Sequence, residues 1–106
     1  MDDQTFDTLA DAELAALTQR LDQFDPDELE ADLSMGVLTI TLGGGGKIII
    51  NSHRAAGQIW MAAFRHAWHF SPRVEGERTV WRTDREELRA TLAAQLSQRC
   101  GRAITL

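Results

Sequence analysis

The first quarter of the chain carries hydrophobic residues at every third or fourth position, the spacing that aligns side chains on one face of a helix. These residues are Phe6, Ala10, Leu14, Leu17, Leu21 and Phe24. Asp25-Pro26 follows them, and the residue before a proline is driven out of helical geometry. The pattern therefore predicts a helix that runs from about Asp3 to Phe24 and buries one stripe.

Beyond Pro26 the hydrophobic period falls to two, which is typical of strands with one buried face. In the first such segment Leu29, Ala31 and Leu33 alternate with Glu28, Glu30 and Asp32. The alternation resumes after a predicted turn at Met35-Gly36, and four glycines at 43–46 predict a hairpin loop. The strands expected after the first are 37–42, 47–51, 58–62, 67–70 and one around 79–82.

The last part of the chain returns to helical spacing, with Leu88, Leu92 and Leu96 on one stripe. Thr83 or Asp84 is the expected N-cap, with an acid three residues later completing a capping box, and Gly101 is the expected stop. The four residues after Arg102 are expected to pack back on the core. Strands between two terminal helices predict an α+β fold, a two-layer sandwich in which an antiparallel sheet of five or six strands packs against both helices. We expect one domain over residues 1–106.

Composition narrows the class of protein. Hydrophobic residues make up 43% of the chain and charged residues 25%, which is ordinary for a folded globular domain. The single Cys100 excludes an intramolecular disulfide and a Cys-x-x-Cys metal or redox motif. No apolar run approaches the roughly 20 residues of a membrane-spanning helix, and the acidic start lacks the basic region of a secretory signal. We therefore expect a cytoplasmic protein without a membrane partner.

Charge is unevenly divided along the chain. Residues 1–32 hold eleven acids and one base, a charge of −10, whereas the rest of the chain holds five acids and ten bases, a charge of +5. An acidic segment repels phosphate groups, which argues against nucleic acid as a partner. The division predicts an acidic pole that attracts cations or basic surfaces, beside a weakly basic body.

The acids form two groups on the predicted elements. The first group, Asp3, Asp7 and Asp11, shares one face of the first helix. The second carboxylate group begins at the far end of that helix, continues into the first predicted strand and consists of Asp22, Asp25, Asp27, Glu28, Glu30 and Asp32. Oxygen ligands suit hard cations, but this run lacks the glycine and terminal glutamate of an EF-hand loop. Two interpretations stay open: a weak, open cation site, or a solvated acidic face that keeps the protein soluble.

No catalytic constellation emerges from the sequence. The glycines before Lys47 lack the Ser or Thr and the helix of a phosphate-binding loop, because an isoleucine strand follows. His66 and His69 lie three apart in a segment that is predicted to be extended, so they face opposite sides, and no third ligand is near. Cys100 has no evident base, and no Ser-His-Asp order can be assembled. We expect a protein that is not an enzyme.

A tryptophan is predicted on the open face of the sheet. If Ile59 and Met61 face the helices, Gln58 and Trp60 point away from them, and Asn51 of the neighbouring strand shares their face. A tryptophan on an uncovered sheet is the kind of residue that anchors interfaces. A tryptophan half-covered by its neighbours, with a structural role only, fits the same spacing.

The order of these segments resembles the frataxin family, in particular its bacterial branch. The resemblance is carried by Gly36-Val37-Leu38-Thr39-Ile40-Thr41, Lys47-Ile48-Ile49-Ile50-Asn51 and Gln58-Ile59-Trp60-Met61-Ala62. It covers most of the chain and implies an antiparallel sheet backed by two terminal helices, in agreement with the fold predicted above. Where the family has a glycine pair before its fifth strand, this chain has His66-Ala67.

The resemblance also implies a function. Frataxin-like proteins bind Fe²⁺ or Fe³⁺ weakly through carboxylates, without an organic cofactor, and act in iron–sulfur cluster assembly as regulators of the cysteine desulfurase or as iron donors. Carried over, the iron ligands fall in the second carboxylate group, with Asp3, Asp7 and Asp11 as further candidates. Asn51, Gln58 and Trp60 match exposed residues of the family that contact partners, namely the desulfurase and the scaffold protein. A monomer that iron can drive into oligomers is implied.

Two other functions remain beside this one. The alternative is a metal-independent protein–protein interaction module that uses the acidic edge and the Trp60 face. A ferroxidase is the least favoured, because iron oxidation usually needs a buried site with fixed histidine or glutamate ligands, whereas this sequence indicates a strip on the surface.

Overall fold

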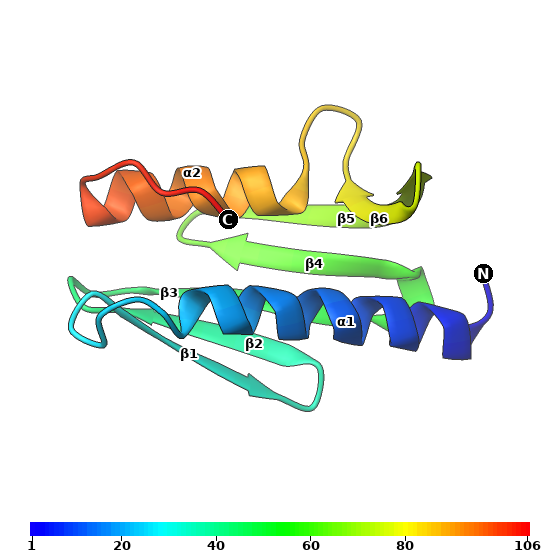
Figure 1. The fold of residues 1–106 in the computed structure, drawn as a ribbon, viewed down its shortest axis with the longest axis horizontal. Coiled ribbons are helices and arrows are strands. Elements are labelled where there is room, and N and C mark those ends of the chain that lie inside the picture. Colours follow the sequence, from blue (N-terminus) through cyan, green and yellow to red (C-terminus); the bar gives the residue numbers. More distant parts are fainter.

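Two helices and a six-stranded antiparallel sheet make up the fold, and the computed structural model describes all 106 residues (Figure 1). Helix α1 (Asp3–Leu21) opens the chain and helix α2 (Leu88–Cys100) closes it. The elements between them are β1 (Leu29–Ser34), β2 (Val37–Leu42), β3 (Lys47–His53), a short 3-10 helix η1 (Arg54–Ala56), β4 (Gln58–Ala63), β5 (His66–Glu75) and β6 (Arg78–Arg82). The predicted α+β sandwich is confirmed, with six strands.

The strands lie in the sheet in the order in which they occur in the chain, and each pairs antiparallel with the next. Ser34 pairs with Val37, so only Met35 and Gly36 form the turn; both have positive φ, as a two-residue hairpin turn requires. Strand β5 is long because it pairs with β4 as far as Phe70 and with β6 from Ser71 onward. The β5–β6 hairpin therefore extends the sheet beyond the first residues of β4.

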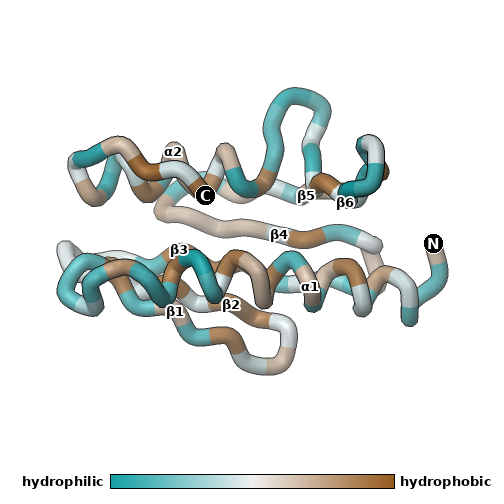
Figure 2. Tube along the Cα trace, viewed as in Figure 1, coloured by the Kyte–Doolittle hydropathy of each residue, from teal (hydrophilic) through white to brown (hydrophobic).

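Both helices lie on one face of the sheet, and the core fills the space between the two layers (Figure 1). The ring of Phe6 meets that of Trp81 edge-on, with centroids 5.8 Å apart, which joins the start of α1 to β6. Ile104 is buried, and Ser97 Oγ accepts a hydrogen bond from its N–H at 2.8 Å, so the expected packing of the tail is confirmed. Figure 2 shows hydrophobic and hydrophilic residues alternating along α1, whereas the loop between β6 and α2 is hydrophilic.

One ion pair joins the two helices. The Glu13 carboxylate accepts hydrogen bonds from Arg89 Nη2 at 2.8 Å and from Arg89 Nε at 3.0 Å. The Glu13 side chain is only 8% exposed, so this two-bond geometry satisfies a carboxylate that water hardly reaches. The charge of Glu13 is therefore balanced between the layers and does not contribute to the acidic surface. Neither helix is long and apolar enough to cross a lipid bilayer.

Helix α1 ends at Leu21, three residues before the predicted end at Phe24. The backbone N–H groups of Gln23 and Phe24 bond to carbonyls three residues back rather than four, a tightening that is common in a last turn. Phe24 still packs against the core. The hydrophobic stripe therefore predicted correctly that Phe24 contacts the core, but the backbone at Phe24 is not α-helical.

The prediction of the α2 N-cap was wrong. The cap is Glu87, whose carboxylate accepts hydrogen bonds from the N–H groups of Arg89 and Ala90 at 2.9 and 3.1 Å. Thr83 instead closes a separate turn, in which its Oγ1 accepts from the N–H of Glu86 at 3.0 Å. The loop ahead of α2 is thus longer than the sequence signal indicated, and Gly101 ends the helix as predicted.

Candidate functional site

The second carboxylate group lies where α1 leads into β1. Asp25 shapes this loop, because its Oδ1 accepts from the N–H of Asp27 at 2.8 Å and its carbonyl accepts from the N–H of Glu28 at 2.8 Å. The loop is held from the side by Gly43, whose N–H donates to the Glu28 carbonyl at 2.9 Å. The glycine-rich loop between β2 and β3 therefore positions the acidic loop.

Three acids of this group line one open hollow of about 370 Å³. Asp22 comes from the end of α1, and Glu30 and Asp32 come from β1; all three side chains are exposed, and none forms an ion pair. No three acidic, histidine or cysteine side chains converge closely enough to hold a metal ion between them. Such an arrangement can gather a hard cation loosely, but it is not a preformed cage.

The other acids of the group have different neighbours. The Glu28 carboxylate accepts from Arg102 Nη2 at 2.7 Å and from Arg102 Nε at 3.0 Å, and this contact lowers its pKa. Asp25 lines a second hollow with Glu28 and Arg102, and Asp27 lines a third that contains Cys100. Burial raises the pKa of the Cys100 thiol, so the neutral form is favoured there. Asp25, Asp27 and Glu28 therefore do not line the hollow that Asp22, Glu30 and Asp32 share.

The Glu28–Arg102 pair makes stability depend on pH. The pKa of Glu28 is lower in the folded state than its ordinary value of 4.5, so the ionised carboxylate stabilises the fold above that value. This contribution is lost as the pH falls from about 4.5 through the lower folded-state pKa. We expect Glu28→Gln to be less stable than the natural protein at pH 7, and urea unfolding to show the gap closing in acid. A gap that stays constant down to pH 3 contradicts this account.

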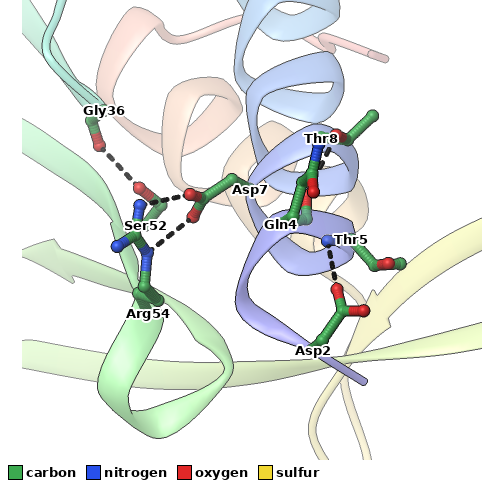
Figure 3. Close-up of polar contacts among 8 residues, drawn as sticks. All are labelled: Asp2, Gln4, Thr5, Asp7, Thr8, Gly36, Ser52 and Arg54. Atoms are coloured by element: carbon green, nitrogen blue, oxygen red, sulfur yellow. Dashed lines mark hydrogen bonds and ion pairs between the residues drawn. The ribbon is translucent and has the colours of Figure 1, made fainter.

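The first group of acids lies at the opposite end of α1. Nineteen residues separate Asp3 from Asp22, which is roughly 28 Å along a helix that rises 1.5 Å per residue. Figure 3 shows Asp7 facing Arg54 of η1, whose Nε donates to Asp7 Oδ1 at 3.1 Å. Asp7 first, and then Asp3 and Asp11, raise the pKa of Arg54. This group is therefore partly neutralised by an arginine and does not share a site with the second group.

The predicted partner residues lie together on the open face of the sheet. Asn51 pairs with Trp60 across β3 and β4, and all three of Asn51, Gln58 and Trp60 are half-buried. The Trp60 Nε1–H donates to Gln58 Oε1 at 2.9 Å, and Gln58 Nε2 donates to Ser71 Oγ at 3.2 Å. The indole is thus held in one orientation by an amide that is itself held by β5.

Two histidines sandwich this tryptophan, which the sequence analysis did not predict. The His53 ring lies 3.9 Å from the Trp60 ring and the His69 ring lies 4.2 Å from it on the other side, both nearly parallel to it. We call His53, Trp60 and His69 the ring stack. The register contains the signal: with Ala63 and His66 closing the β4–β5 hairpin, Trp60 falls opposite His69. His66 lies instead near the ring of Trp68, so the prediction that His66 and His69 face opposite sides agrees with the geometry.

Comparison with known proteins shows the family to which the chain is related. A sequence model of the frataxin-like domain matches residues 1–102. The chain is 38% identical, over the full length of both proteins, to the iron-sulfur cluster assembly protein CyaY of Thioalkalivibrio sulfidiphilus (strain HL-EbGR7). Among solved structures it is similar to a frataxin from Psychromonas ingrahamii, with a TM-score of 0.82 and 19% identity over 99% of this chain and 97% of that one.

Proposed function

The chain belongs to the frataxin-like family, and from this premise we propose that it is an iron-binding protein of iron–sulfur cluster assembly. Involvement in that process follows from its relationship to a CyaY protein. In our proposal the chain gathers Fe²⁺ or Fe³⁺ at its acidic edge and acts on the cysteine desulfurase of the cytoplasm as an iron-dependent regulator or an iron donor. It performs assembly rather than catalysis.

The observation that carries the proposal is the hollow shared by Asp22, Glu30 and Asp32. These carboxylates are exposed, come from two elements, and have no arginine or lysine to neutralise them. Neighbouring unpaired carboxylates repel one another, and a di- or trivalent cation relieves that repulsion. The chemistry of the oxygen donors fits iron as a loosely held cargo. The same uncompensated charge steers the protein toward a basic surface on a partner such as the desulfurase.

Iron binding at the hollow is tested by anaerobic titration with Fe²⁺, followed by amide NMR signals. Because Fe²⁺ is paramagnetic, we expect signals of β1 and of the end of α1 to broaden first. A variant with Asp22→Asn, Glu30→Gln and Asp32→Asn should lose this broadening. A matched control removes the same charge elsewhere, with Asp3→Asn, Asp11→Asn and Glu77→Gln, and should keep it. Broadening that centres on the start of α1, or that survives in the first variant, refutes the site.

A second candidate function, binding to a partner without metal, is favoured by a different observation. No three metal-binding side chains converge in the protein, whereas the Trp60 face is already organised by Gln58 and the ring stack. The same charge variants separate the two functions when binding to the desulfurase is measured by calorimetry with and without iron. If the hollow variant binds more weakly than the natural protein even without iron, and iron strengthens neither, charge alone holds the partner. If it loses only the iron-dependent part, the proposed function holds.

A further inference from the structure

The open face of the sheet changes its charge from one edge to the other. Glu30 and Asp32 lie at the β1 edge, since they alternate with the buried Leu29. Trp60 lies near the centre, and at the far side Ser71 of β5 pairs with Arg82 of β6. Both helices lie on the opposite face (Figure 1), so no element of the fold covers this gradient.

A hollow of about 360 Å³ opens at the positive end of this face, and none of the residues that line it is hydrophobic. We call His69, Ser71, Arg73 and Arg82, which line it, the basic corner. Neither arginine takes part in an ion pair. Asp84 also lines the hollow but forms an ion pair with neither of them. The corner therefore presents two uncompensated guanidinium groups to solvent.

The basic corner is continuous with the ring stack. His69 belongs to both, because its ring stacks on Trp60 and its side chain lines the hollow. Gln58 also lines the hollow and fixes both the Trp60 indole and the Ser71 hydroxyl. The two surfaces therefore adjoin, and a segment that covers Trp60 also comes within reach of the arginines.

We propose that the basic corner binds a carboxylate-bearing segment of the protein partner that covers Trp60. The inference rests on the proposed function only in taking this face as a partner surface. The hollow is open and Arg73 is exposed, so a small free anion competes there with bulk water for the same donors. A protein segment instead gains apolar contact at Trp60 and places its carboxylates against guanidinium forks that match them.

The gradient also fixes how the partner lies. A partner segment with acids over β5 and β6 and basic residues over β1 meets opposite charge at both ends. The reversed orientation sets like charges against each other at both edges. Complementarity of this kind selects orientation and partner more than it adds affinity.

The experiment titrates the ¹⁵N-labelled full chain with a ten-residue peptide of alternating glutamate and glycine. We expect shifts of the Trp60 Nε1–H signal and of amides in 69–73 and 82. Arg73→Gln with Arg82→Gln should weaken binding of the peptide about tenfold or more, since two charge-assisted contacts are lost. The control, Arg65→Gln with Arg85→Gln, removes the same charge from exposed turns outside the hollow and should change binding less than about threefold.

Three results overturn the inference: equal weakening in both double variants, the same shifts with a lysine–glycine peptide, or inorganic phosphate alone binding as tightly as the glutamate peptide. The last result indicates a small-anion site. The Fe²⁺ titration of the Arg73→Gln, Arg82→Gln variant distinguishes this inference from the proposed function. Loss of peptide binding with iron broadening intact supports the basic corner, while absence of iron broadening in the natural protein refutes only the iron site.

Discussion

Replacing Gly43 with alanine is expected to lower the free energy of unfolding by about 3 kcal/mol, the upper part of the usual range for overpacking. A Cβ atom built on Gly43 would lie 1.8 Å from the carbonyl oxygen of Asp27 and 2.9 Å from its carbonyl carbon. Both are backbone atoms, so no side chain can rotate to relieve the clash. The acidic loop must move instead, which also breaks the hydrogen bond from Gly43 N–H to the Glu28 carbonyl.

Urea unfolding followed by circular dichroism measures this loss, and Gly44→Ala is the matched control. A Cβ on Gly44 meets no atom within 4 Å, so the same chemical change is expected to alter stability by less than about 1 kcal/mol. Because the clash displaces the acidic loop, Gly43→Ala should also shift the amide signals of residues 25–30 under native conditions. Similar unfolding midpoints for the two variants contradict the packing described for this loop.

Trp81→Ala is expected to cost about 3–5 kcal/mol, the range for removing a large aromatic side chain from a core. Trp81 is 1% exposed and packs edge-on against Phe6, so the substitution leaves a cavity between β6 and α1. Domains of this size are stable by only about 5–15 kcal/mol, so thermal unfolding should shift by many degrees.

Trp60→Ala provides the comparison for Trp81→Ala. Trp60 is half-buried on the open face, where its loss removes contacts with two histidine rings but creates no enclosed cavity. We expect it to cost less than half as much as Trp81→Ala when the thermal unfolding of both variants is measured. If the two costs are equal, the open face is more tightly packed than the exposed fractions of its side chains indicate.

Periodicity predicted the elements of this fold well where the pattern is local. The helical stripe of α1 and the alternation of β2 specify which side is buried, because packing on one face is what the repeat records. The strand predicted over 67–70 extends in the structure over His66–Glu75, although Pro72 lies within it and proline disfavours central strands. From Pro72 onward β5 has no β4 partner, so it is an edge there and tolerates the proline.

The sequence predicted which acids belong to the candidate site, but it did not predict how they lie relative to one another or which arginines they contact. Nothing near Glu28 in sequence reveals that Arg102, 74 residues away, binds its carboxylate. Likewise Asp7 meets Arg54 across 47 residues. The ring stack depends on the register of the strands. A shift of one residue in the pairing of a strand would turn its side chains to the other face of the sheet and would abolish the stack. Contacts set by tertiary packing between distant segments are therefore the part that a local pattern does not contain.

The chain-ordered sheet has a consequence for how the protein reaches its native state. Each strand pairs with its neighbour in the chain, and the hairpin turns at Met35-Gly36 and at residues 64–65 close very short loops, which is fast and loses little entropy. The contact between Glu13 and Arg89 spans 76 residues and can form only after α2 exists. During synthesis on the ribosome, the sheet is therefore complete before the C-terminal helix. Its hydrophobic face is then covered only in part, by α1, until α2 packs against it.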